Sequence, residues 1–437
     1  MISRHTFLRH PAAALLSFAI VAGGNLFADG AEPLVVNRDG AVETAFANNR
    51  ELRIAELEVK RAKAVLRWSG RLDNPEFELN YSDDGVGLDE NEGVLEVAFS
   101  QRFPITSRLK DEKRLRGYQV VFAEAEIAER RRELAGEVDL AAVELMATRA
   151  VVARQRKLGV LNQEIVTFLG EQMAQGQVSK LDLTQARLTG RSIDQTIKAL
   201  AAEEKVRALK LKQLMGIEPT RPVQLTDRLD LPGARPDTRI AAETIFGKRP
   251  DFVLALSRID EAEASIALEK SRRWEDIAVR VFGERERAVD EPTGLERNTF
   301  LGVGTSIPLP LRQRNQEGIE RSLINRDAAE KSVEAARFHI RSEYEEAFQQ
   351  RLANWALASE ASGEVLSLAE ENFSEFQKAY REGQASLIQV QRAQEQQLEL
   401  ETAAVQAIAE YYRADAQFRF VTGDYPGLIR KGATDSK

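Results

Sequence analysis

The sequence predicts a mainly α-helical chain with a small antiparallel β part, built from a duplicated unit of helix, β-hairpin, long helix and helix. The first observation is the duplication: Asn49–Tyr81 aligns without a gap with Arg249–Val281, and apolar positions coincide. The second is a pair of long proline-free stretches with apolar residues at helical spacing. The third is a pair of alternating segments before each long stretch. Such a duplication fixes the architecture, because each copy builds the same elements.

The two copies share three further features that define their limits. Each has a proline where the β-hairpin leads into the long helix, a G-x-x-S turn at the far end of that helix, and a closing glycine. These features are Pro104 and Pro308, Gly176–Ser179 and Gly383–Ser386, and Gly216 and Gly423. The predicted organisation is a signal peptide (1–28), a first repeat (29–216), a linker (217–242), a second repeat (243–424) and a C-terminal tail (425–437).

The first residues have the three-part layout of a secretory signal peptide. Arg4 and Arg9 precede an apolar run, Ala12–Gly24, and small residues follow it. A transmembrane anchor is the alternative, but a spanning helix needs ~20 apolar residues and this run has only ~13. We expect cleavage after Ala28 or Gly30 and find no other apolar run of spanning length. The mature protein is therefore expected outside the cytoplasm.

Composition excludes several classes of function. Of the 437 residues 30% are charged, the net charge is −8, and no basic block is present, so phosphate-driven nucleic-acid binding is not expected. Cleavage after Ala28 removes two arginines and changes the net charge from −8 to −10. The chain has no cysteine and, apart from His5 and His10 near its start, only His339. Without H-E-x-x-H, C-x-x-C or P-loop patterns, we expect no enzyme activity, no metal site and no cofactor.

The expected helices have lengths that fit one another. Ser107–Gln175 contains no proline and would be ~100 Å long at 1.5 Å per residue, and Arg312–Glu382 is its counterpart. The shorter helices would be ~45–55 Å each, so two laid end to end equal one long helix. Such helices bury their apolar faces only against other helices, which predicts a rod four helices thick. The shorter helices are about Arg38–Arg71, Lys180–Met215, Ala241–Arg272 and Leu387–Val421.

Each long helix is expected to end in a helical hairpin tip. Glycine suits the left-handed position that ends a helix, and a serine three residues later caps the next helix. The residue three positions past that serine reaches back to the cap. The residues are Gly176, Ser179 and Asp182 in the first copy, and Gly383, Ser386 and Gln389 in the second.

Four strands are expected, two in each copy. In the first copy, Asn74–Tyr81 and Val94–Phe103 alternate apolar with polar or small residues. The alternation is weaker in the second copy, at about Asp276–Phe282 and Thr299–Ile307. One apolar and one polar face is normal for a half-buried antiparallel sheet, and it is also the pattern of an outer-membrane barrel. The expected loops between paired strands are Ser82–Gly93 and Glu284–Asn298.

The polar face of these strands has two interpretations: it lines a water-filled lumen, or it faces solvent as on any half-exposed sheet. Four strands cannot close a barrel, and open edges in lipid would leave backbone groups unpaired. Three copies, which together have twelve strands, are therefore expected to complete it. The candidate lumen residues are Glu76, Glu78, Asn80, Glu96 and Ser100.

This ordered set of features resembles the outer-membrane efflux channels of Gram-negative bacteria, the TolC family, over about residues 38–424. Ile307–Gly318 is similar to the CzcC-like branch, which serves heavy-metal efflux. The resemblance implies a homotrimer with a twelve-stranded β-barrel in the outer membrane, continued by a periplasmic α-helical barrel of ~100 Å with residues 217–242 at its equator. It also implies a passive exit duct with two partners, a periplasmic adaptor (membrane fusion) protein and an inner-membrane efflux pump of the resistance-nodulation-division type.

The resemblance further implies a gate at the helical tips, where acidic side chains ring the pore. Asp182 keeps an acid in the first copy, whereas Gln389 and Arg392 stand in the corresponding part of the second. A ring of three Asp182 carboxylates attracts cations, and Arg392 is its candidate partner in a closed tip. The alternative is that Asp182 only partners the helix cap. The residues expected to contact the adaptor are Gly176, Val178, Ser179, Gly383, Ala385 and Ser386.

The main alternative function is that of a periplasmic coiled-coil adaptor or structural scaffold. An adaptor carries one helical hairpin between two halves of a lipoyl-like β domain. Here two hairpins each follow their own β-ribbon, which favours the channel. Heavy-metal cations are the substrate suggested by the stretch Ile307–Gly318, and drugs remain the alternative.

Overall fold

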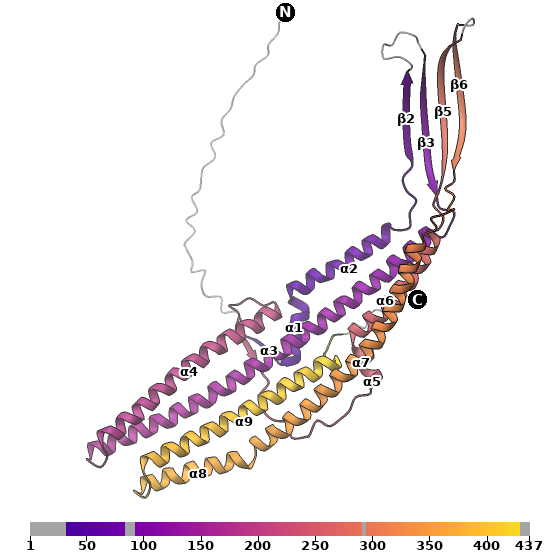
Figure 1. Ribbon diagram of the computed structural model, residues 1–437. Helices are drawn as coiled ribbons and strands as arrows, with labels where there is room; N and C mark the ends of the chain where they lie inside the picture. Colours follow the sequence, from indigo (N-terminus) through magenta and orange to yellow (C-terminus); the bar gives the residue numbers. More distant parts are fainter. Residues whose placement is uncertain (1–31, 84–91, 291–293, 429–437) are drawn as a thin grey trace, which may run out of the picture.

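The computed structural model describes residues 32–83, 92–290 and 294–428. The molecule is elongated: two helical hairpins lie at one end, and a four-stranded sheet projects at the other (Figure 1). This mainly helical fold with a small antiparallel sheet confirms the predicted fold class at that level. The predicted signal peptide and most of the first expected loop lie outside the described residues.

The repeat of elements follows the predicted order in both copies. In the first copy the elements are β1 (Leu34–Val36), α1 (Arg38–Asn48), α2 (Arg50–Trp68), β2 (Glu76–Asp83), β3 (Gly93–Phe103), α3 (Arg108–Ala174) and α4 (Lys180–Met215). After β4 (Val223–Leu225) come α5 (Ala242–Lys248), α6 (Pro250–Ser271), β5 (Ile277–Asp290), β6 (Gly294–Ser306), α7 (Gln316–Ala361), α8 (Glu364–Arg381) and α9 (Leu387–Thr422).

Each copy begins with a helix that is interrupted at the same place, so the predicted single helices Arg38–Arg71 and Ala241–Arg272 are wrong in this detail. Asn49 is extended, with φ −61° and ψ 125°, and its side chain caps α2 while its amide donates to a backbone carbonyl of α4 at 2.9 Å. Arg249, its counterpart in the duplication, is also extended. It precedes Pro250, whose ring disfavours the helical conformation of the residue before it.

The long helix of the second copy is also interrupted, unlike that of the first. α3 runs unbroken through 67 residues, whereas the predicted helix Arg312–Glu382 consists of α7 and α8. The interruption falls at Ser362 and Gly363, residue types that form helix poorly. The Ser362 hydroxyl donates to the Ala358 carbonyl at 2.6 Å, which closes the end of α7. α7 begins later than predicted, because Asn315 adopts a left-handed conformation with φ 55°.

The four-stranded sheet has the order β2-β3-β5-β6, and every neighbouring pair is antiparallel. The central pair, β3 and β5, joins the two copies. The predicted loop Glu284–Asn298 is wrong: β5 continues to Asp290 and β6 starts at Gly294. The segment Gly283–Ala288 reads Gly-Glu-Arg-Glu-Arg-Ala, in which negative and positive side chains alternate. A strict twofold alternation is typical of a strand even when the residues are charged.

The linker between the copies is anchored to the helices at several points. β4 pairs in parallel with β1, a two-stranded sheet that the sequence pattern did not predict. The Trp355 indole donates to the Pro232 carbonyl at 3.0 Å, and the Tyr412 hydroxyl donates to the Asp230 carbonyl at 2.7 Å. The linker therefore lies across α7 and α9 near the middle of the helical part.

Three apolar clusters hold the helices together. One packs α1, α3 and α4 against the chain end, where Tyr425 and Leu428 are buried, so the start of the predicted tail belongs to the core. A second joins α5, α6, α7 and α9, and a third joins the two hairpins close to their tips. No helix in the described part of the chain is long and apolar enough to cross a membrane.

Candidate functional site

The polar face of the sheet brings the predicted lumen residues together. Glu76 pairs with Ser100 and Asn80 with Glu96 across β2 and β3, so these side chains share one face. The Asn80 amide donates to the Glu96 carboxylate at 3.0 Å. Glu78 lies between these pairs on the same face and is bound by an arginine from the second copy.

That arginine is Arg280 of β5, which the sequence reasoning did not single out. Its guanidinium donates to Glu78 at 3.1 Å and to Glu96 at 2.5 Å, and it lies 5.3 Å from the ring of Phe282. Its position could have been found from the duplication, since Arg280 corresponds to Asn80. The cross-copy ion pairs leave the polar face with more carboxylates than cations.

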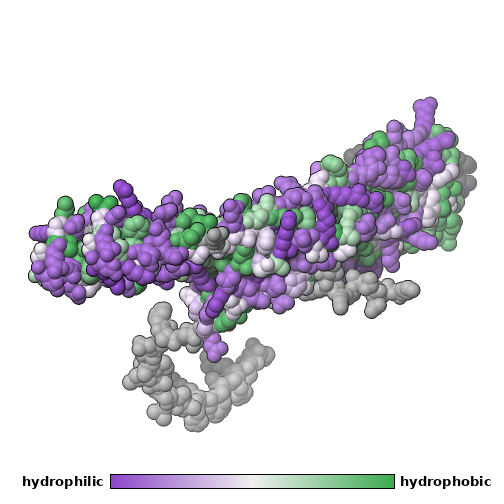
Figure 2. Space-filling model, turned by 90° about the horizontal axis from the view of Figure 1, so that it is seen from below, coloured by the Kyte–Doolittle hydropathy of each residue, from purple (hydrophilic) through white to green (hydrophobic). Residues whose placement is uncertain are grey.

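The opposite face of the sheet is apolar and uncovered. Leu301 and Val303 are 89% and 72% exposed, and the rings of Phe77 and Phe99 contact each other with centroids 5.1 Å apart. Hydrophobic side chains reach the surface at this strand end of the molecule (Figure 2). A water-facing sheet rarely presents such a continuous apolar surface, so this face requires an apolar environment. Other large exposed residues on it include Leu79, Tyr81, Leu95, Val97 and Val281.

The helical tips adopt the predicted turns. Gly176 and Gly383 both have φ 76°, and no atom lies within 4 Å of the position that a β-carbon would occupy on either. Ser386 and Gln389 form a complete capping box. In the first copy, Ser179 caps Asp182, and the Ser179 hydroxyl donates to the Asp182 carboxylate at 2.8 Å, but that carboxylate does not bond the cap backbone.

The predicted adaptor-contact residues lie at the outer ends of the two hairpins. Val178 and Ala385 are half-buried, and the glycines and serines of both turns are exposed. The chain therefore presents two similar small-residue tips side by side (Figure 1).

The predicted gate residues remain separate within one chain. Gln389 and Arg392 are exposed, Asp182 is half-buried, and no ion pair among the described residues joins Asp182 to Arg392. The charge of Asp182 acts on Tyr380 of α8. Burial raises the pKa of Tyr380, and the negative charge of Asp182 raises it further. Tyr380 packs edge-on against Phe168 of α3, with centroids 5.8 Å apart. The sequence reasoning missed both aromatic residues, because they resemble ordinary apolar helix positions.

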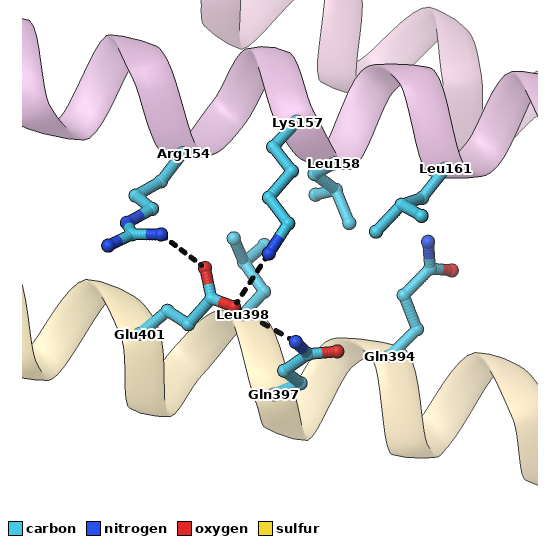
Figure 3. Close-up of a pocket in the computed structure, with 8 residues that line it drawn as sticks. All are labelled: Arg154, Lys157, Leu158, Leu161, Gln394, Gln397, Leu398 and Glu401. Carbon is cyan, nitrogen blue, oxygen red and sulfur yellow. Dashed lines mark hydrogen bonds and ion pairs between the residues drawn. The ribbon is translucent and has the colours of Figure 1, made fainter. Parts of the chain in front are cut away.

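A polar seam lies between α3 and α9 (Figure 3). Glu401 lies 3.7 Å from Arg154 and 3.9 Å from Lys157, and it accepts a hydrogen bond from Gln397 at 2.9 Å. Next to it, Gln394 is 6% exposed and its amide nitrogen has no partner among the described residues. The two hairpins thus meet at this level through charged and amide groups beside Leu158, Leu161 and Leu398.

A buried ion network joins both copies closer to the linker. Asp139 of α3 is fully buried and accepts hydrogen bonds from Arg38 at 2.6 and 3.0 Å and from Arg419 at 3.1 Å. Asp415 accepts from Arg38 at 3.1 Å and pairs with Arg351 at 2.8 Å. Burial acts to lower the pKa of Arg38, but the two carboxylates outweigh it and raise that pKa above its ordinary value. The network fixes α1, α3, α7 and α9 relative to one another.

The described residues contain no cluster of three or more His, Cys, Asp or Glu side chains that could hold a metal ion.

Comparisons with known proteins bear on the whole fold. Residues 243–424 match the family model described as outer membrane efflux protein. The chain is similar to the cobalt-zinc-cadmium resistance protein CzcC of Cupriavidus metallidurans, with 20% identity over 390 residues, which cover 88% of this chain and 89% of that protein.

Solved structures have the same fold. The structure of CusC superposes with a TM-score of 0.70 at 18% identity, covering 89% of this chain and 93% of CusC. The outer membrane protein VceC of Vibrio cholerae superposes with a TM-score of 0.66 at 16% identity, covering 88% of this chain and 96% of VceC.

Proposed function

Because residues 243–424 belong to the family of outer membrane efflux proteins and the described chain follows the same fold throughout, we propose that the protein is the outer-membrane channel of a tripartite efflux system. The family resemblance expected from the sequence is confirmed. Proteins of this family are transport ducts and not enzymes. The observation that carries the proposal is the sheet: one exposed apolar face, one charged face, and long helical hairpins that continue from it.

The edges of this sheet support the proposed homotrimer with a twelve-stranded barrel. β2 and β6 each leave one side unpaired among the described residues, and an unpaired strand edge in lipid loses backbone hydrogen bonds. Apolar positions of β3 extend from Leu95 to Phe103, which is ~27 Å along a strand and ~20 Å across a bilayer at the usual tilt. That height approaches the ~25 Å apolar band of outer-membrane barrels.

Membrane fractionation tests the assignment against the soluble alternatives. The full-length protein, expressed in a Gram-negative host, is expected in the outer membrane as a trimer that migrates differently before and after boiling. A soluble periplasmic monomer would refute the channel and favour the adaptor or scaffold. Two hairpins, each following its own β-ribbon, already argue against the adaptor.

The proposed partners meet the channel at the helical tips. Small residues at both turns permit close backbone approach, which suits contact with helical hairpins of a periplasmic adaptor. The adaptor in turn links the channel to an inner-membrane pump of the resistance-nodulation-division type. Val178→Glu and Ala385→Glu are expected to abolish efflux while trimers persist; Leu188→Glu, at a residue that is exposed on α4 away from the tip, is the matched control. Normal efflux by both tip variants would contradict this contact.

Metal cations are the proposed substrate. The polar face of the sheet is rich in glutamates, and a negatively charged wall concentrates cations and repels anions. The similar protein CzcC is named for cobalt, zinc and cadmium resistance. A strain lacking the gene is expected to become sensitive to these metals and to recover with the gene in trans. Sensitivity to drugs and detergents alone would assign a different substrate.

The proposed gate is a ring of Asp182 residues, one from each chain. Since Arg392 and Asp182 do not pair within a chain, any such pair would form between neighbouring chains of the trimer. Asp182→Ala is expected to raise the leak of small ions across planar bilayers, and Arg392→Ala to raise it as well. If Asp182→Ala leaves conductance unchanged while thermal stability falls, Asp182 serves only the helix cap.

A further inference from the structure

The charged ends of β5 and β6 separate positive from negative side chains. Residues 284–287 read Glu-Arg-Glu-Arg, and residues 296–297 read Glu-Arg. Because successive residues of a strand point to opposite faces, the glutamates and the arginines lie on different sides of the same ribbon. The register puts Glu284 opposite Glu96, on the polar face, and Arg285 opposite Leu95, on the apolar face.

The arginines continue the apolar face toward the free end of the sheet. One row across the four strands consists of Leu79, Val97, Gly283 and Leu301. The next row outward consists of Tyr81, Leu95, Arg285 and Thr299. The row after that consists of Asp83, Gly93, Arg287 and Arg297. The outward face thus changes from apolar to aromatic and basic within two rows, ~14 Å along the strands.

Among the described residues, this arrangement places positive charges next to one another without an ion-pair partner. Arg287 and Arg297 stand directly opposite each other, and like charges at that position destabilise a sheet. Both are exposed, as is Arg285, and no ion pair among the described residues involves any of the three. Asp83 shares their row, but its carboxylate accepts a hydrogen bond from Tyr81 at 3.1 Å. An external anion would relieve the repulsion.

The position of the three arginines relative to the membrane indicates which anion they bind. Under the proposed function, the free end of the sheet lies in the outer leaflet, and the row of Tyr81 lies where aromatic girdles meet lipid headgroups. Guanidinium groups bind phosphate through two parallel hydrogen bonds. We infer that Arg285, Arg287 and Arg297 form a binding surface for the phosphate groups of anionic lipids that surround the barrel. This inference rests on the proposed outer-membrane location.

Lipid titration of the purified, detergent-solubilised full-length trimer tests the inference. The probes are bis-phosphorylated lipid A and lipid A from which the phosphates have been removed, with bound lipid counted by native mass spectrometry. Wild-type protein is expected to bind the phosphorylated form more tightly. Each arginine near an anionic surface changes affinity about fivefold, so R285Q/R287Q/R297Q is expected to lose on the order of 100-fold. R285K/R287K/R297K keeps the charges but not the paired hydrogen bonds, so its affinity should fall between those of the wild type and the triple glutamine variant.

The matched control is E284Q/E286Q/E296Q, which changes three charges on the other face of the same strands and should leave lipid affinity unchanged. Excess inorganic phosphate should not displace the lipid; displacement would show a site for free phosphate rather than for lipid. If the triple glutamine variant does not assemble, R285Q and R297Q are measured singly.

Equal affinity of wild type and the glutamine variants would overturn the inference and leave the channel intact. A soluble monomer found only in the periplasm would overturn the proposed function instead.

Discussion

Asp139→Asn tests the buried ion network that joins the two copies. The change keeps the shape of the side chain but removes the charge that Arg38 and Arg419 share through three hydrogen bonds of 2.6, 3.0 and 3.1 Å. Arg38 keeps Asp415, and Arg419 keeps Asp39, so neither arginine is left without a carboxylate. Removing one partner of a buried pair lowers the free energy of unfolding by ~3–5 kcal/mol, and the remaining partners favour the lower end, ~3 kcal/mol.

Thermal unfolding of the detergent-solubilised full-length protein measures this loss of stability. With an unfolding entropy of ~2.1 cal/mol/K per residue over about 400 residues, a loss of ~3 kcal/mol lowers the midpoint by ~3–4 °C. The matched control is Glu58→Gln, which breaks an exposed pair with Arg61 whose side chains are 60% and 76% exposed. That pair is worth ~0.5 kcal/mol or less.

Equal midpoints for Asp139→Asn and Glu58→Gln would refute the reasoning, because the buried network would then contribute no more than a surface pair. A double variant with Arg419→Gln sharpens the result. If Asp139 and Arg419 act through each other, the double variant loses less than the sum of the single variants.

Two further predictions concern pH and the membrane. A hydrogen bond from Arg413, helped by the charges of Arg413 and Arg207, holds the pKa of Glu144 below its ordinary value of 4.5 although burial acts to raise it. Because the pKa is lowered on folding, the ionised Glu144 contributes its full stability above pH 4.5, and this contribution is lost as the pH falls through the folded-state pKa. Glu144→Gln should therefore flatten the acid side of a plot of unfolding midpoint against pH. An unchanged acid slope would contradict this. Leu301→Lys on the apolar face should cost ~2–4 kcal/mol of membrane stability, measured by urea titration in vesicles, whereas Ser100→Lys on the polar face should not, and equal losses would reverse the assignment of the faces.

The duplication made most of the fold predictable. Once Asn49–Tyr81 was aligned with Arg249–Val281, the order of elements, the hairpin tips and the four strands followed from periodicity and turn chemistry. The long helix α3 was found to within one residue at each end, because no proline or cap interrupts it. A single non-helical residue cannot be detected from periodicity, because the apolar pattern resumes directly after it. This is why the interruptions at Asn49, Arg249 and Gly363 were missed.

The sites were less predictable, because they depend on contacts between distant elements. The predicted lumen residues were found from alternation within a strand, but Arg280 binds them only because β5 pairs with β3. The ends of β5 and β6 were taken for a loop because their residues are charged, although charge does not disturb the twofold alternation. Tyr380 approaches Asp182 through the packing of one hairpin on the other, which no local pattern encodes.

The closing glycines show how the end of each copy contacts its beginning. Gly216 and Gly423 are left-handed, with φ 68° and 66°, and each packs against the helix interruption at the start of its own copy. A β-carbon on Gly216 would lie 2.4 Å from the Asn48 carbonyl oxygen, and one on Gly423 would lie 2.8 Å from the Lys248 carbonyl oxygen. Both obstacles are backbone atoms, so no side-chain rotation relieves them. The end of the last helix in each copy therefore packs tightly against the end of the first helix in that copy.

Comparing Gly216→Ala with Gly176→Ala separates the effect of this backbone contact from the effect of left-handed backbone strain. Both glycines are left-handed, so alanine costs ~1–2 kcal/mol at either position. Gly216 and Gly423, unlike Gly176, also have a backbone oxygen near that position, at 2.4 and 2.8 Å, and forced displacement in a packed region adds ~1–3 kcal/mol. Unfolding midpoints should therefore fall in the order Gly176→Ala, Gly423→Ala, Gly216→Ala, from smallest to largest effect. Equal effects would mean that left-handed geometry alone requires these glycines, and that the end of each copy moves freely against its beginning.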